Sequence, residues 1–124
     1  MEYKEKSSHT VFKRFCKSLE LRNDKELIKA YKAVHAKGAA WAEITQGMLE
    51  VGIIDMEIYI AGTRLFMIMD TVPEFDHEKA MKELAGKPQQ KEWEAYVSKF
   101  QGSSSDATAD EKWHLIERIY KLNE

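Results

Sequence analysis

The chain has 124 residues, enough for one domain with a hydrophobic core and too few for two ordinary domains. Hydrophobic residues make up 44% of the sequence and charged residues 32%, with a formal net charge of -2. This balance argues against a disordered chain and against a nucleic-acid binder with a dominant positive surface. We therefore expect a single domain over residues 1–124 that begins with an N-terminal tail at 1–10.

The sequence also predicts a cytoplasmic protein with no membrane partner. Residues 1–8 are charged and polar, and no window approaches the roughly 18 apolar residues of a membrane span. Cys16 is the one cysteine of the sequence, so it cannot form an internal disulfide. We expect it to be a small buried hydrophobe.

The first predicted element is a strand at residues 11–21, which is rich in strand formers. Phe15, Lys17, Leu19 and Leu21 alternate there with Arg14, Cys16, Ser18 and Glu20. Helical spacing of its apolar residues fits nearly as well. The clear start of a helix just after it, where Asn23 or Asp24 can cap, favours the strand.

The helix that follows carries its apolar residues on one stripe and is expected to end at Gly38. The stripe consists of Leu27, Ile28, Tyr31, Val34 and His35. A second short helix is predicted at residues 41–50.

The next pattern predicts a β-hairpin, because residues 51–60 and 64–72 are rich in β-branched and aromatic residues around the turn at 61–63. Two helices are then predicted, at 76–85 and 90–100. A polar segment at 102–111 is expected to be a mobile loop.

The last segment, residues 112–122, fits a helix and a strand equally well. As a strand it would complete the order strand, helix, strand, strand, helix, strand, which is a ferredoxin-like α+β sandwich with a four-stranded antiparallel sheet. Helices cover one face of such a sheet, and a second copy commonly buries the other face or a long terminal strand. We therefore expect a homodimer.

Tyr31 and His35 are four residues apart on a predicted helix, so their rings lie side by side. Taken alone, the spacing favours two packed core residues over a catalytic pair. A buried imidazole would still suit proton exchange near neutral pH.

Other candidate groups have simpler interpretations. Asp76, His77 and Glu78 lack the second histidine of a zinc motif, which indicates helix capping and a surface role. Trp93 has the spacing of a packing residue, although an aromatic ring beside a carboxylate such as Glu92 is typical of sugar sites.

Five short motifs, taken in their order and spacing, resemble the L-rhamnose mutarotase family from about Arg14 to Leu122. They are Tyr31-x-x-x-His35, Trp41-Ala-Glu-Ile, Gly52 before the strand Asp-Met-Glu-Ile-Tyr, Arg64-Leu-Phe-Met, and Glu92-Trp93. The resemblance implies a cytoplasmic homodimer of ferredoxin-like subunits in a dimeric α/β barrel-type assembly. It implies an enzyme that interconverts the α and β anomers of a 6-deoxy-L-hexose without a cofactor or metal, and a final segment that is a strand.

The resemblance also implies roles for single residues. His35 matches the family's proton-donating histidine, Tyr31 a substrate-binding tyrosine, and Trp93 the second of two adjacent tryptophans in the sugar pocket. Met56 replaces a sugar-binding tyrosine of rhamnose-specific members, and Glu92 replaces their first tryptophan, a pattern that resembles a branch acting on L-fucose. The alternative is a non-catalytic or cofactor-binding module on the same dimeric fold.

Overall fold

The computed structural model describes residues 11–36 and 41–123. The predicted tail at 1–10 and the residue Gly38 lie outside these ranges. Within them, no helix is both long and apolar enough to cross a membrane. The described elements, in chain order, are β1 (Lys13–Glu20), α1 (Lys25–Val34), α2 (Ala42–Glu50), β2 (Ile53–Ala61), β3 (Arg64–Thr71), α3 (His77–Ala85), α4 (Gln90–Gln101), α5 (Ala109–Lys112) and β4 (His114–Leu115).

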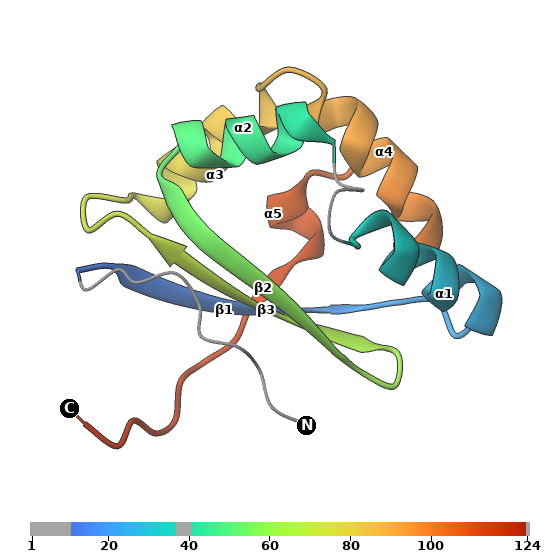
Figure 1. Ribbon diagram of the computed structural model, residues 1–124, viewed down its shortest axis with the longest axis horizontal. Coiled ribbons are helices and arrows are strands. Elements are labelled where there is room, and N and C mark those ends of the chain that lie inside the picture. The colour runs from blue at the N-terminus through green and yellow to red at the C-terminus, as the bar shows by residue number, and fades with distance from the viewer. Residues whose placement is uncertain (1–10, 37–40, 124) are drawn as a thin grey trace.

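The four strands form one antiparallel sheet in the order β2-β3-β1-β4. Helices α1 to α4 lie over one face of this sheet, and α5 lies between them and the strands (Figure 1). This arrangement is the predicted ferredoxin-like α+β sandwich, so the predicted fold class is confirmed.

The alternation along β1 decides which of its side chains face the helices. Lys17 pairs with Met67 and Leu19 with Leu65, and all four side chains are buried between the sheet and the helices. Cys16 points to the opposite, open face and is only half-buried. The expectation that Cys16 is a buried hydrophobe was therefore wrong, because the helices of the described ranges all lie over the other face of the sheet.

A β-bulge near the start of β2 sets the direction of the following side chains. Ile53 pairs with Thr71 and Asp55 with Asp70, so Ile54 is an extra residue in β2. Without the extra residue, Ile53 and Met56 would face opposite sides of the sheet, because side chains alternate along a strand. With it, both face the same side. Met56 thus faces the helices.

Helix α1 begins as predicted and ends earlier than predicted. The side chain of Asp24 accepts from the backbone N–H groups of Glu26 and Leu27, which satisfies two free donors of the first turn. The helix ends at Val34, and His35 is its C-cap. At this end Nδ1 of His35 donates to the carbonyl oxygen of Tyr31.

The C-terminal region departs most from the sequence predictions. The segment expected as a loop at 102–111 contains the start of α5, because Thr108 and Glu111 form a capping box at its first turn. The strand expected at 112–122 is limited to β4, since Lys112 belongs to α5 and the hydrogen bonds to β1 end with Ile116 N–H donating to the Cys16 carbonyl. Beyond that point the chain extends away from the sheet (Figure 1).

Candidate active site

A cavity of about 120 Å³ lies between the helix-covered face of the sheet and the helices. This volume has room for several water molecules, and therefore for a small polar ligand. Apolar side chains from β2, β3 and α3 form much of its wall, including Ile53, Ile58, Met67, Met69 and Leu84. His35 and Thr45 line the cavity and are solvent-exposed, so its mouth lies between the end of α1 and α2.

His35 is held at this mouth in one tautomer. Its Nδ1 lies 2.9 Å from the carbonyl oxygen of Tyr31, and because a carbonyl can only accept, Nδ1 is the donor. In the neutral ring, Nε2 therefore carries the lone pair that can take a proton.

The surroundings of the imidazole favour its neutral form. The ring packs on Tyr31 with centroids 4.4 Å apart and edge-on to Trp93 at 5.6 Å. Although the residue is exposed on its outer side, this burial of the ring lowers the pKa of His35 below its ordinary 6.5, against a smaller opposite effect of the hydrogen bond to Tyr31. This favours the neutral imidazole at pH 7, and the exposed residue is not a packed core histidine.

Tyr31 and Trp93 form the inner aromatic wall beside His35, and both are buried. The hydroxyl of Tyr31 accepts from Nε2 of Gln101 at 3.4 Å. Burial raises the pKa of Tyr31 to about 12, so it keeps its proton at physiological pH. Trp41 packs edge-on against Trp93, with ring centroids 5.2 Å apart, and supports it from outside.

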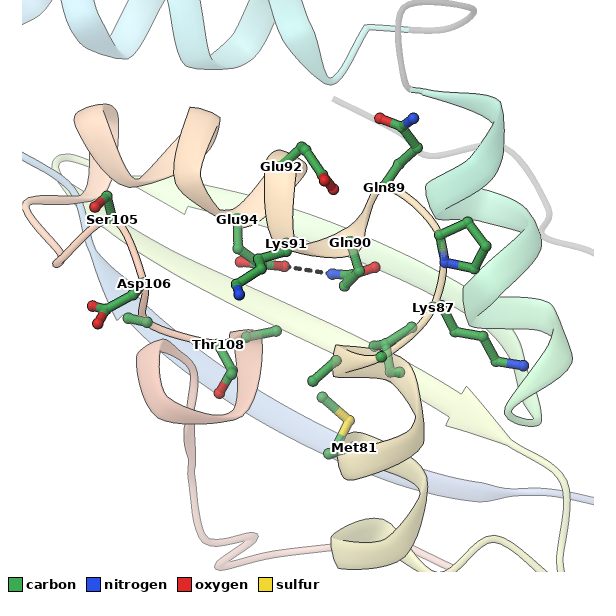
Figure 2. A pocket seen from close by; sticks show the side chains of 16 residues that line it. Met81, Lys87, Gln89, Gln90, Lys91, Glu92, Glu94, Ser105, Asp106 and Thr108 are labelled. Carbon is green, nitrogen blue, oxygen red and sulfur yellow. Dashed lines mark hydrogen bonds between the residues drawn. The ribbon is translucent and has the colours of Figure 1, made fainter.

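The structure brings four of the five predicted site residues to this cavity and leaves out the fifth. Met56 lines it beside His35, Tyr31 and Trp93. Glu92 is exposed and lines a separate outer hollow of about 470 Å³, between the end of α3, the start of α4 and residues 105–109 (Figure 2).

The carboxylate that reaches the cavity is Glu94, which the sequence reasoning missed. Residues two apart on a helix point about 200° apart, so Glu92 and Glu94 face nearly opposite ways. The missed indication was present in the sequence: Gln90, Glu94, Val97 and Gln101 recur at spacings of four, three and four, as on one helical stripe.

Glu94 is part of a buried polar network on α4. Its Oε1 lies 2.5 Å from Nζ of Lys112, and its Oε2 accepts from Nε2 of Gln90 at 2.6 Å. Nζ of Lys112 also donates to the hydroxyl of Ser98 at 3.3 Å. Figure 2 shows Gln90 and Glu94 joined by their hydrogen bond at the wall of the outer hollow, and the same two residues also line the inner cavity. They therefore separate the two spaces.

Lys17 lines the same cavity from the sheet, and it too was missed. Its side chain is 1% exposed, and burial lowers its pKa to about 8. In the sequence Lys17 belongs to the same alternating set as Phe15 and Leu19, and the structure places it with Leu19 on the helix-covered face.

The site combines a base and aromatic walls with several hydrogen-bonding groups in a small, partly enclosed space. Across residues 11–36 and 41–123, no group of three or more His, Cys, Asp or Glu side chains is arranged to hold a metal ion. Asp76 caps α3 by accepting from the backbone of Lys79, which confirms the capping prediction. Such a site can exchange protons with a small molecule that carries hydroxyl groups.

Comparisons with known proteins show what the chain is similar to. The family model described as L-rhamnose mutarotase matches residues 14–122. An L-fucose mutarotase of Xanthomonas campestris pv. campestris is 32% identical over 111 residues, covering 90% of this chain and 89% of the relative. A UPF0734 protein of Dictyostelium discoideum is 33% identical over 118 residues, covering 90% and 91% of the two chains.

A solved structure has a similar fold. The crystal structure of an L-rhamnose mutarotase from Formosa agariphila superposes with a TM-score of 0.66. The match covers 89% of this chain and 98% of the other, at 17% sequence identity. At this identity the likeness concerns the fold.

Proposed function

The chain belongs to the L-rhamnose mutarotase family, and we infer that it is an anomeric isomerase that interconverts the α and β anomers of a 6-deoxy-L-hexose. The observation that carries the assignment is the imidazole of His35 at the mouth of the cavity, with Nδ1 on the Tyr31 carbonyl and Nε2 as the base. The fold and the family matches support the same reaction.

Anomer exchange requires the sugar ring to open and close again. In the proposed mechanism, Nε2 of His35 takes the proton of the anomeric hydroxyl while the ring oxygen gains a proton from water at the exposed mouth. The bond between C1 and the ring oxygen breaks, the aldehyde rotates, and closure on its other face reverses both transfers. No proton is consumed overall, and general acid-base catalysis of this kind contributes on the order of 10² to 10⁴ in rate.

The remaining cavity residues are proposed to bind the sugar. Trp93 would pack on a C–H face of the ring, and the hydroxyl of Tyr31 would position a sugar hydroxyl. Met56 would contact an apolar part of the sugar, such as the methyl group of a 6-deoxy-hexose. Glu92, an outer-hollow residue, has no part in this proposal.

We propose L-fucose as the preferred sugar and L-rhamnose as the second candidate. The relative named L-fucose mutarotase supports this order, and it covers nearly the whole chain. The cavity also carries Glu94, a carboxylate that accepts hydrogen bonds from hydroxyl groups.

We further propose that the protein is a homodimer. Among the described residues, one face of the sheet carries no helix. The segment after Ile116 exposes large apolar side chains, with Ile119 at 90% and Leu122 at 79% exposure. Exposed apolar groups of this kind commonly mark a protein interface. A second copy that receives this segment on its sheet would cover both surfaces, and the predicted cytoplasmic location stays a prediction.

The proposed activity is tested by NMR exchange spectroscopy on sugars at anomeric equilibrium. Wild-type protein should accelerate exchange between the anomers of L-fucose and L-rhamnose more than that of D-glucose, the control hexose. Exchange at the uncatalysed rate for all three sugars would contradict the proposal.

A further inference from the structure

Lys17 is a buried cation without an oxygen partner in the described part of the chain. Its Nζ makes a hydrogen bond to Sδ of Met81 at 4.0 Å, and a thioether is a weak acceptor. A buried ammonium group is costly unless it is paired. A polar ligand in the cavity would supply the acceptor that Lys17 lacks.

Two buried amides of the same cavity have the complementary deficit. The side-chain oxygens of Gln90 and Gln101 have no hydrogen-bond partner among the described residues, and both side chains are buried. Buried polar groups are normally satisfied, so two orphan acceptors in one small cavity indicate a missing donor. The residues that line the cavity therefore include one donor group without an oxygen partner and two unsatisfied acceptors, and Gln90 also borders the outer hollow.

The charged residues near Lys17 do not provide its missing partner. Glu94, the carboxylate of the cavity, is already paired with Lys112 at 2.5 Å. Asp110 of α5 acts on Lys17 through its field, as Lys17 acts on His77 of α3, but neither forms an ion pair with it in the described part of the chain. A ligand is left as the natural partner of the Lys17 amine.

We propose that Lys17, Gln90 and Gln101 bind the hydroxyl groups of a neutral monosaccharide and determine which sugar the cavity accepts. Each sugar hydroxyl both donates and accepts, so adjacent hydroxyls can receive N–H groups from Lys17 and donate to the two amide oxygens. The inference rests on the proposed function and extends it to three residues outside the motifs of the family resemblance. A site built this way rejects sugars in which a hydroxyl is missing or misdirected, because a buried group is then left unpaired.

The test measures sugar binding directly, by tryptophan fluorescence, since Trp93 and Trp113 line the cavity. Wild-type protein and the variants Lys17→Met, Gln101→Leu and Lys13→Met are titrated with L-fucose and L-rhamnose. Lys13→Met is the matched control, because Lys13 lies on the same strand and is exposed, with its Nζ on the carbonyl of Phe75.

Lys17→Met should weaken binding about 10- to 100-fold and Gln101→Leu about 10-fold, while Lys13→Met binds as the wild type does. In the exchange assay Lys17→Met should raise KM more than it lowers kcat, because Lys17 is proposed to bind the sugar rather than to move its proton.

The outcomes separate this inference from the proposed function. Sugar binding by wild type that is unchanged in both Lys17→Met and Gln101→Leu would overturn the inference and leave the activity standing. If the wild type binds sugar without anomer exchange, only the proposed activity is contradicted. The Lys17→Met and Gln101→Leu variants would then still show whether these residues bind the sugar. Wild-type protein that binds neither sugar would overturn both.

Discussion

His35 shows how one backbone contact determines the chemistry of a side chain. Its Nδ1 is committed to the Tyr31 carbonyl, so proton exchange falls to Nε2. The adjacent rings of Tyr31 and Trp93 favour the neutral imidazole, while the residue stays exposed to water at the mouth. A base at the edge of a cavity can thus meet both the sugar and solvent.

The lowered pKa of His35 predicts the acid limb of the pH profile. Because the folded-state pKa lies below 6.5, the imidazole remains a base to lower pH than a free histidine does. The value of kcat/KM should therefore fall with an apparent pKa below 6.5 as the pH is lowered. Exchange rates measured between about pH 4.5 and 8 would test this, and a midpoint clearly above 6.5 would contradict it.

Lys17 predicts a gain of stability on mutation. Burial holds its pKa at about 8, against 10.5 for the free side chain, so the folded state binds the proton less tightly than the unfolded state does. The resulting penalty is complete below pH 8 and disappears as the pH rises through 10.5. Lys17→Met should raise the free energy of unfolding at pH 7 by about 3 kcal/mol.

Urea denaturation at pH 7 and near pH 10 would measure this gain, with Lys13→Met as the control. The gain should shrink at the higher pH. A Lys17→Met variant that is less stable than wild type at both values would show that Lys17 is a structural residue.

At the scale of elements, a buried ion pair joins α4 to the short helix α5. Lys112 and Glu94 have side-chain exposures of 2% and 10%, so water does not screen them. Removing Lys112 leaves the Glu94 carboxylate buried without its cation, with only the hydrogen bond from Gln90. Lys112→Met should therefore destabilise the protein by about 3–5 kcal/mol.

The double variant Lys112→Met, Glu94→Gln should recover most of that loss, as urea denaturation of the single and double variants would show. The exposed pair of Lys82 and Glu78, 3.9 Å apart on α3, provides the control, and Lys82→Met should change stability by less than about 0.5 kcal/mol. Equal effects of Lys112→Met and Lys82→Met would contradict the role assigned to the buried pair.

Local sequence patterns predicted most of the elements. Alternation identified β1, the β-branched runs with Gly62 between them identified the hairpin, and the Asp24 and Asp76 caps marked two helix starts. The errors lie where distant contacts decide. α5 forms where Lys112 contacts Glu94. These residues are 18 positions apart in sequence, so no local pattern reveals the contact.

The site was predictable to a similar degree. The family resemblance supplied His35, Tyr31, Trp93 and Met56, and the structure brings these together. It also led to Glu92 in place of Glu94, although the helical stripe of α4 distinguishes the two. The orphan amide oxygens could not be foreseen, since a missing partner becomes visible only in three dimensions.

At the scale of the whole molecule, the exposed C-terminal segment predicts the oligomeric state. Wild-type protein should elute as a dimer, and replacing both Ile119 and Leu122 by Asp should give a monomer, because the new charges cannot be buried in an interface. Size-exclusion chromatography with light scattering would measure both. Lys121→Asp, a charge change in the same segment, should remain dimeric, and a monomeric wild type would contradict the proposal.

The central claim is that His35 carries the proton in anomer exchange. NMR exchange rates of L-fucose with wild type, His35→Ala and His114→Ala test it most directly, since His114 is an exposed histidine of β4 that does not line the cavity. His35→Ala should lose most of the acceleration, on the order of 10²-fold or more, with an unchanged circular dichroism spectrum, while His114→Ala keeps it. A folded His35→Ala variant that exchanges the anomers at the wild-type rate would contradict the claim.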